Sequence, residues 1–200
     1  MDPVLPAQIW RACLSLKHVL LGMLRQPSSG YDVKKQFDTS LRNFWKAELS
    51  QIYPTLQKLE TEGLLSSAKV DSEQGPQRVV YSQTESGKAE LLHWLGDGPT
   101  VGTERIGFLA QTYFLAQLGD ANKAIEFFEE LRSYFAERLE ALQAREAEWS
   151  AANPLYPDEL PDHDFFPQLT LDCGIHRIAA TLAWCDKTLT RLKQRQRSAA

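Results

Sequence analysis

The sequence predicts a mainly α-helical protein with two domains, of which the first contains one small β-hairpin and the second is all-helical. Apolar residues recur every three or four positions through most of the chain, the spacing of a helix with one buried side. Two short runs typical of strands flank a polar turn in the first half. The stretch GDGPTVG at 96–102 then interrupts the helical pattern. We therefore predict domains at 1–97, with an N-terminal arm at 1–14, and at 103–200.

Composition argues against a disordered or membrane-spanning chain. The 200 residues are 43% hydrophobic and 24% charged, and no apolar run is long enough to cross a bilayer as a helix. The start of the chain, MDPVLPAQIW, lacks the basic residues and apolar stretch of a signal peptide. The three cysteines, Cys13, Cys173 and Cys185, are too few for a disulfide framework and fit a reducing compartment. We therefore expect a cytoplasmic protein.

The net charge of −4 is unevenly distributed. Up to Asp97 the chain has 11 basic and 11 acidic residues, whereas the rest has 11 and 15. An acidic average disfavours indiscriminate binding to nucleic acids. A local basic surface is still compatible with the neutral first half, so that half is the place to look for one.

Two short helices are predicted before residue 42. The first covers Leu16–Gln26, and the sequence PSSG at 27–30 ends it. The second covers Tyr31–Leu41. Its expected inward-facing residues are Tyr31, Val33, Phe37 and Leu41.

The segment SQIYPTLQKLETEGLL at 50–65 predicts a third helix in spite of its proline. Ser50 is the expected N-cap, which places Pro54 in the opening turn, where backbone N–H groups have few helical partners. Gly63 suits the left-handed conformation that ends many helices. The inward-facing side consists of Ile52, Leu56 and Leu59.

A β-hairpin and a fourth helix follow. Strands are predicted at Leu64–Val70 and Arg78–Ser82, joined by the polar connection DSEQGPQ. A hairpin of this size is marginally stable alone and has to pack on the helices. Thr84 is the expected N-cap of a helix that continues to Leu95.

The second domain is predicted to consist of three helices. Arg105–Leu118 is apolar on more than one side and is expected to be covered on two faces. Asp120 is the expected N-cap of a long helix to about Trp149, followed by an irregular loop at Asn153–Pro167. The last helix, Leu169–Lys193, has apolar residues separated alternately by four and three positions, the seam of helices packed lengthwise. These seam residues are Leu171, Ile175, Ile178, Leu182, Cys185, Leu189 and Leu192.

Two helices, a short third helix and a hairpin form the layout of a winged helix-turn-helix, in which the third helix enters the DNA major groove. The polar side of that helix carries Gln51, Tyr53, Thr55 and Lys58. Glutamine can bond adenine through two atoms, threonine offers a hydroxyl and a methyl group, and lysine pairs with phosphate or guanine. Lys69 and Arg78 of the hairpin can reach the neighbouring DNA backbone. The same polar pattern also fits an ordinary solvated helix surface.

Three stretches of the first half resemble the PadR family of bacterial transcriptional regulators. They are LKHVLLGML with SSGYDVKKQF, FWKAELSQIYPTLQKLETEGLL, and RVVYSQTESGKAELLHWL, which occur in this order between Leu16 and Leu95. The resemblance implies a winged helix-turn-helix DNA-binding domain, a helical C-terminal dimerisation domain and, usually, repression. The long second half is similar to that of the larger, AphA-like members.

The resemblance also implies which positions contact DNA. Those on the third helix are Ser50, Gln51, Tyr53, Pro54, Thr55 and Lys58. Those on the hairpin, called the wing, are Lys69, Gln77 and Arg78. Members of the family often have a more basic run before the wing tyrosine, whereas here Val79 and Val80 precede Tyr81.

We therefore predict a homodimeric repressor that binds double-stranded DNA and reads a pseudo-palindromic operator. Gln51 and Thr55 are expected to read bases. The expected phosphate contacts are Tyr53, Lys58, Lys69 and Arg78. The last helix is expected to hold the dimer, helped by the N-terminal arm and the helix at Arg105–Leu118. The alternative is a small-molecule-sensing or protein-interaction module whose winged helix does not bind DNA.

No enzyme motif, metal site or cofactor is predicted. The chain has no glycine-rich phosphate loop, no G-x-S-x-G motif and no Cys-x-x-Cys pair. The cluster Asp162, His163, Asp164 fits solvated loop charges better than a metal site, because adjacent side chains point in different directions. Cys173 and His176 lie one helical turn apart, but two ligands do not make a site.

Two tryptophans of the second domain are candidates for a ligand pocket. Some members of the family bind flat aromatic compounds between subunits, so Trp149 or Trp184 is a candidate wall for a small aromatic effector. The simpler interpretation is that both rings fill the core or the dimer interface. Similarly, the basic residues at the end of the chain fit the negative end of a helix dipole, with a phosphate contact as the alternative. They are Arg191, Lys193, Arg195 and Arg197.

Overall fold

The computed structural model describes residues 16–41, 44–72, 75–100 and 106–199. At 71–72, 75–77 and 199 it describes the backbone alone, so the side chain of Gln77 lies outside the description, as does the predicted N-terminal arm. The chain divides into two compact units, Met1–Glu104 and Arg105–Ala200, and each is considered by itself below.

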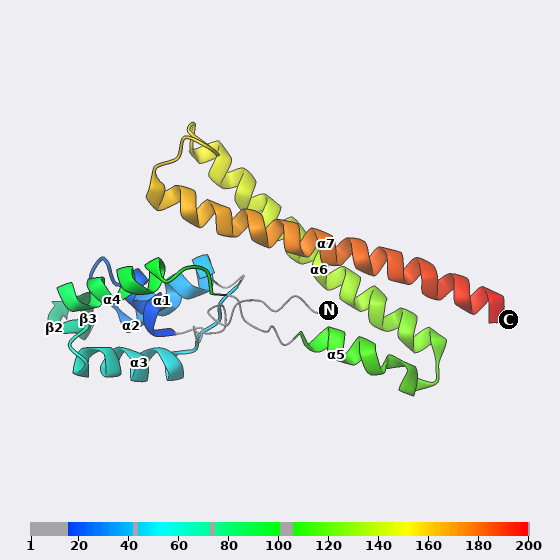
Figure 1. Ribbon diagram of the computed structural model, residues 1–200, viewed down its shortest axis with the longest axis horizontal. Helices are drawn as coiled ribbons and strands as arrows, with labels where there is room; N and C mark the ends of the chain where they lie inside the picture. Colours follow the sequence, from blue (N-terminus) through cyan, green and yellow to red (C-terminus); the bar gives the residue numbers. More distant parts are fainter. Residues whose placement is uncertain (1–15, 42–43, 73–74, 101–105, 200) are drawn as a thin grey trace. The chain divides into compact units, whose positions relative to one another are not determined.

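The described residues of the first unit form four α-helices and a small sheet (Figure 1). The predicted hairpin is confirmed, and the turn after the first helix contributes a short third strand that the sequence did not predict. The elements are α1 Leu16–Met23, β1 Ser28–Ser29, α2 Gly30–Gln36 with a π-helical turn η2 at Phe37–Leu41, α3 Leu49–Thr61, β2 Leu65–Ser72, β3 Gly75–Gln83 and α4 Glu85–Gly96.

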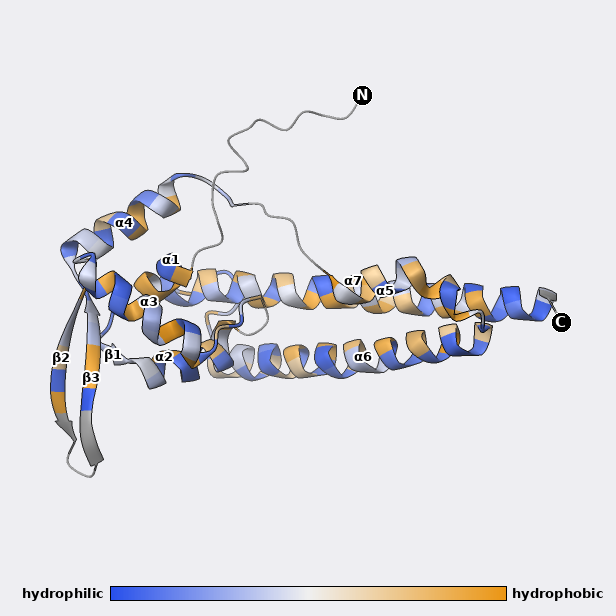
Figure 2. Cartoon of the chain, turned by 90° about the horizontal axis from the view of Figure 1, so that it is seen from below, coloured by the Kyte–Doolittle hydropathy of each residue, from blue (hydrophilic) through white to orange (hydrophobic). Residues whose placement is uncertain are grey.

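The sheet is antiparallel with the strand order β1-β3-β2. The short strand β1 pairs with β3 only at Ser28 and Ser29, opposite Tyr81 and Val80. The hairpin of β2 and β3 therefore continues beyond β1, and it projects away from the helices of this unit (Figure 2). It has the shape of a wing.

One apolar core holds the helices and the base of the wing together. It is formed by Leu20, Leu21, Leu24, Val33, Phe37, Ala47, Ile52, Leu56, Leu59, Leu65 and Tyr81. The inward side predicted for the third helix is confirmed, because Ile52, Leu56 and Leu59 are at most 1% exposed. The inward position predicted for Tyr31 is wrong, because its side chain is 66% exposed. Tyr31 lies two residues before the buried Val33, which places it on the opposite side of α2.

The start of α3 differs from the prediction. Its N-cap is Glu48, not Ser50, and the Glu48 backbone N–H donates to Gln51 Oε1 at 3.1 Å. Pro54 is therefore the sixth helical residue, in the second turn and not the first. Without a proline N–H, the Ser50 carbonyl lacks its usual partner four residues on. The helix tolerates this because both residues lie on its exposed side.

Polar contacts join α1 to α4. Lys17 Nζ lies 2.7 Å and His18 Nε2 3.2 Å from Glu90 Oε1, and the His18 ring stacks on Trp94. The hydrogen bond from Lys17, assisted by His18, holds the pKa of Glu90 below its ordinary value. The charged carboxylate of α4 thus stays bonded to side chains of α1 at neutral pH.

The start of α4 is packed against the end of α3. The predicted cap is confirmed, because Thr84 Oγ1 accepts from the Gly87 N–H at 3.0 Å. The same hydroxyl donates to the carbonyl of Gly63, which ends α3 with the left-handed φ of 72°. A Cβ on Gly87 would overlap the carbonyl of Leu64. Only glycine fits between the two backbones here.

The described residues of the second unit form helices and the loops that join them, with no strand among them (Figure 1). Its elements are α5 Gly107–Phe114 with a 3-10 turn η3 at Leu115–Leu118, α6 Ala121–Ala152 and α7 Asp162–Ala199. Asp120 caps α6 as predicted, accepting from the Asn122 N–H at 2.8 Å. The predicted loop to Pro167 is too long, because α7 begins at Asp162 and contains Pro167 as its sixth residue.

The apolar seam of α7 packs on α6 of the same chain, and the two helices run antiparallel (Figures 1 and 2). Four seam residues are buried, namely Leu171, Ile178, Cys185 and Leu189. Polar side-chain contacts also join α6 to α7: Arg132 with Asp186, Glu129 with Lys193, and Asn122 with Gln196. Because the seam is covered within one chain, contact with a second copy needs other surfaces.

The helix α5 is less covered than the sequence predicted. None of its residues is buried, so the expectation of two covered faces is wrong for the single chain. Phe108 contacts the rings of Phe135 and Trp184, which attaches α5 to α6 and α7. Large apolar side chains remain exposed on α5 and η3: Leu109, Tyr113, Phe114 and Leu118.

Candidate nucleic-acid interface

The helix α3 has two chemically different sides. At about 100° per residue, the buried residues Ile52, Leu56 and Leu59 fall on one narrow stripe. The residues farthest around the helix from this stripe are Ser50, Pro54, Gln57, Lys58 and Thr61, and all five are exposed. The inner stripe fixes the helix to the first unit, and its outer side is left exposed.

Both side chains that were predicted to read bases make hydrogen bonds within α3. Gln51 Oε1 accepts from the Glu48 backbone, and Thr55 Oγ1 donates to the Gln51 carbonyl at 2.7 Å. Gln51 therefore keeps its amide N–H groups for an acceptor on a base, while Thr55 keeps its methyl group and its oxygen lone pairs. Thr55 is also half-buried, at the flank of the outer side.

Gln57 is an outer-side residue that the sequence analysis missed. It lies about 140° around the helix from Ile52, farther from the buried stripe than Gln51. It is exposed, and among the described contacts its side-chain amide makes no hydrogen bond. The spacing of the three buried residues contained this signal, because it places position 57 opposite the core.

Lys58 is the cation of the outer side. Its side chain is 74% exposed, and its Nζ lies 3.8 Å from Glu62 Oε1 one turn along the helix. An exposed pair at this distance contributes little. Lys58 can therefore exchange Glu62 for a phosphate at small cost.

Two tyrosines of the helix-turn-helix are exposed. Tyr53 of α3 is 41% exposed, and Tyr31 at the start of α2 is 66% exposed. Tyr31 was predicted in the core, but its position two residues before the buried Val33 indicates the opposite side of α2. Tyr81, in contrast, is buried at the base of the wing, where burial, and secondarily the charge of Glu60, raises its pKa. It belongs to the core and not to the interface.

The wing places its two predicted cations on opposite faces. Lys69 pairs with Val79, and Val70 pairs with Arg78. Directly paired residues share a face of an antiparallel hairpin, while successive residues alternate. Lys69 and Arg78 can therefore contact DNA together only if the hairpin enters a groove edge-on, with one cation towards each groove wall.

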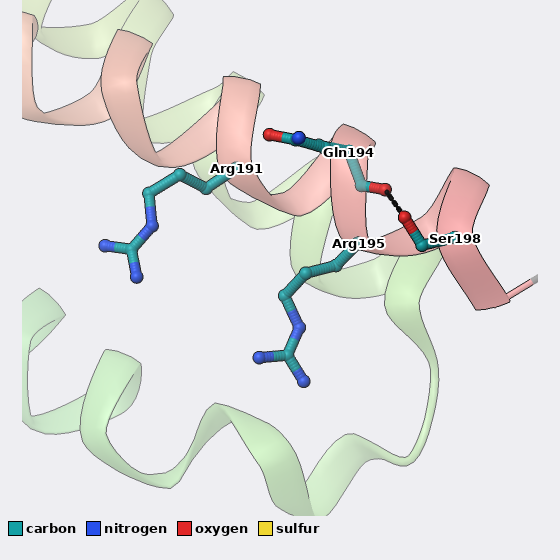
Figure 3. Close-up of a pocket in the computed structure, with 4 residues that line it drawn as sticks. All are labelled: Arg191, Gln194, Arg195 and Ser198. Carbon is teal, nitrogen blue, oxygen red and sulfur yellow. Dashed lines mark hydrogen bonds between the residues drawn. The ribbon is translucent and has the colours of Figure 1, made fainter.

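The structure does not bring Trp149 and Trp184 together. Trp184 packs in the cluster around Phe128, and Trp149 packs in a second cluster around Leu142 and Leu171. A hollow in the second unit lies elsewhere, at the end of α7 (Figure 3). Its lining residues are Arg191, Gln194, Arg195 and Ser198. The two arginines extend in the same direction from α7, one turn apart (Figure 3).

The remaining clusters of chemically active side chains in the described residues lie outside α3 and the wing. Within them, no group of three or more His, Cys, Asp or Glu side chains is arranged to hold a metal ion. Asp162, His163 and Asp164 lie in the first turn of α7, with His163 Nε2 3.5 Å from Asp164 Oδ2. Among the described helices, none combines the length and the apolar character needed to cross a bilayer.

The exposed polar side of α3, the helix before it and the projecting hairpin define the first unit as a winged helix-turn-helix, the DNA-binding fold of many transcriptional regulators. Comparisons with known proteins agree. Residues 19–104 match the model of the transcriptional regulator PadR-like family, and residues 104–193 match that of the virulence activator alpha C-terminal domain. The negative transcriptional regulator PadR of Bacillus subtilis is 30% identical over 179 residues, which cover 88% of this chain and 97% of the relative. The chain belongs to the PadR family of transcriptional regulators, and it is not an enzyme.

Solved structures of relatives match this chain across both of its units. The crystal structure of Bacillus subtilis PadR in complex with operator DNA has a TM-score of 0.77 at 29% identity, covering 88% of this chain and 98% of that one. The structure of the Vibrio cholerae virulence activator AphA has a TM-score of 0.70 at 29% identity, covering 90% and 99%. The predicted mainly α-helical fold with its winged helix-turn-helix is thereby confirmed.

Proposed function

We propose that this DNA-binding regulator is a cytoplasmic, homodimeric repressor of a pseudo-palindromic operator. The observation that carries the proposal is the outer side of α3, where polar residues stay exposed while the inner stripe is fully buried. A relative with 29% identity over almost its whole length was crystallised with operator DNA, which supports the same role here. Two copies of α3 about one DNA turn apart, or a multiple of it, require an operator with two related half-sites.

The proposed contacts divide into base reading and phosphate binding. Gln51 and Thr55 are assigned to bases, and the free amide of Gln57 is added to them. Tyr53, Lys58, Lys69 and Arg78 are assigned to phosphates. Ser50, Pro54 and Gln77 complete the proposed interface.

The proposed dimer uses surfaces other than the seam of α7. The exposed apolar residues of α5 and η3 form a continuous sequence segment that a second copy can cover. We propose that this segment, the free side of α7 and the N-terminal arm form the dimer interface. Sedimentation at several protein concentrations measures the oligomeric state.

Selection of bound fragments from random DNA tests the main proposal. The expected result is an enriched sequence with two inverted half-sites, protected from nuclease by the protein. Expression from a promoter that contains this sequence should then fall when the protein is produced. No enriched palindrome even at low salt would favour the alternative, a sensing or interaction module whose winged helix does not bind DNA.

Lys58→Ala and Gln51→Ala are expected to weaken DNA binding in different ways. Loss of one phosphate contact should lower affinity for all sequences and reduce the slope of log K against log salt by about 0.9. Loss of one base contact should reduce the preference for the operator over scrambled DNA, by about 1–3 kcal/mol per base pair read. Titrations with both DNAs at several salt concentrations separate the two effects. Lys123→Ala, which removes an exposed cation of α6, is the matched control. Equal losses from both changes would contradict the assignment.

A small aromatic effector is a second proposal about the same regulator. A relative with 30% identity was crystallised with p-coumaric acid. In this chain, Trp184 contacts Phe108 and Phe128, so aromatic rings from α5, α6 and α7 meet at one point.

We predict that p-coumaric acid releases this chain from its operator, and that Trp184→Phe or Trp149→Phe weakens this release without changing operator affinity. The smaller ring removes contact area from a flat ligand. Operator binding is measured at increasing p-coumaric acid concentration. Trp94→Phe in the first unit is the control. A release curve unchanged in both variants would remove the two tryptophans from the proposed pocket.

A further inference from the structure

Gly30, the first residue of α2, lies directly under the ring of Tyr53. A Cβ built on Gly30 would lie 2.6 Å from Tyr53 Cε1, 2.8 Å from Cζ and 3.2 Å from the phenol oxygen. In proteins, a Cβ atom essentially never lies within 3.0 Å of a heavy atom to which it is not covalently linked. The phenol end of Tyr53 therefore occupies the space that any other residue at position 30 would need.

The backbone does not explain this glycine. Among the described glycines, those with positive φ are Gly63, Gly98 and Gly119, so Gly30 has a conformation that other residues adopt readily. It begins a helix capped by Ser29, whose Oγ accepts from the Asp32 N–H at 3.2 Å. The missing side chain at this position is therefore required by the contact with Tyr53 and not by the backbone conformation.

The contact joins the two helices of the helix-turn-helix through a residue at the DNA-facing surface. Tyr53 is 41% exposed, so one part of its ring rests on α2 while the rest is accessible. The neighbouring residues Ile52 and Leu56 are buried, so α3 cannot shift to make room for a larger residue at position 30. A methyl group there would have to displace the ring itself.

We propose that Gly30 is a positioning residue for operator binding: it holds the Tyr53 phenol in the place from which it contacts the DNA backbone. This inference rests on the proposed role of Tyr53. It assigns a function in recognition to a residue that lies outside the recognition helix and is itself buried.

A double-mutant cycle tests the proposal. Gly30→Ala and Tyr53→Ala are each expected to weaken operator binding about tenfold or more, the value of one hydrogen bond to a charged group. The double variant should bind like Tyr53→Ala alone, within about twofold, because Gly30 acts only through that ring. Gly22→Ala in α1 is the control, since no atom lies within 4 Å of a Cβ at that position. The double variant has room for the new methyl group, so it keeps the test valid if Gly30→Ala alone folds poorly.

The outcomes are distinguishable. If Tyr53→Ala weakens binding but Gly30→Ala does not, the positioning role is wrong and the phosphate contact stands. Independent losses that add in the double variant would also overturn the positioning role, since they would show that Gly30 acts without the ring. If Tyr53→Ala binds like the unchanged protein, both the contact and the inference are wrong. Thermal unfolding of the unchanged protein and of all four variants identifies losses that come from unfolding.

Discussion

Leu56→Ala should lower the free energy of unfolding of the first unit by about 2–5 kcal/mol, the usual cost of emptying a fully buried leucine site. Leu56 is completely buried in the stripe that attaches α3 to the core. Its loss should leave the recognition helix less firmly placed, and operator affinity should fall by about tenfold or more, which corresponds to about 1.4 kcal/mol of binding free energy.

Amide hydrogen exchange resolves this effect by helix. Protection should fall in α3 and remain unchanged in α6, because the core around Leu56 contains residues of the first unit only. Leu142→Ala is the matched control: it removes the same group from a site of the second unit that is 5% exposed. It should reduce protection in α6 and α7 and leave α3 unaffected. Loss of protection in both units from Leu56→Ala would show that they unfold together.

Gly87→Ala is the second change expected to have a large effect. The new methyl group would overlap the carbonyl of Leu64, a backbone atom that cannot rotate away as a side chain can. The start of α4 would have to move away from the end of α3. This should lower the free energy of unfolding by about 1–3 kcal/mol or more, as overpacking does. The Thr84 cap would be strained by the same movement, because it bonds Gly87 and Gly63 at once.

Gly96→Ala at the other end of the same helix provides the control. No atom lies within 4 Å of a Cβ at Gly96, and the residue belongs to the last turn of α4. Alanine favours a helix over glycine by up to about 1 kcal/mol, so this change should be neutral or slightly stabilising. Denaturant unfolding measures both. A Gly87→Ala variant as stable as the unchanged protein would show that the junction of α3 and α4 yields more easily than its geometry indicates.

Spacing and caps were sufficient to predict much of the fold. The buried stripe of α3 followed from the intervals between Ile52, Leu56 and Leu59. Thr84 and Asp120 were correct as caps because residues with short polar side chains are strong capping signals. Glu48 is not among the preferred caps, so the start of α3 was placed two residues too late.

Proline misled the sequence analysis at two helices for the same reason. Pro54 and Pro167 are each the sixth residue of a helix, beyond the first turn where proline is expected. Tertiary packing, which local rules do not contain, extends both helices over these positions. Buried residues lie close to both prolines: Ile52 two positions before Pro54 on α3, and Gln168 directly after Pro167 on α7.

The candidate site was predictable in its location but not in its hydrogen bonds. The outer side of α3 followed from the helical period, whereas the bond between Gln51 and the Glu48 backbone depends on where the helix begins. The placement of Lys69 and Arg78 on opposite faces depends on the strand register. A shift of one strand by one residue would turn all its side chains to the other face of the hairpin. The space above Gly30 is visible only when α2 and α3 are placed together.

The pairing of α6 with α7 within one chain bears on how the regulator assembles. The apolar side of α7 is covered by α6 of the same chain, so this helix pair can fold without a second molecule. Two folded α6–α7 helix pairs would then associate and dissociate without unfolding. Mixed assemblies should therefore form when a tagged and an untagged batch are combined, at a rate set by dissociation and not by refolding.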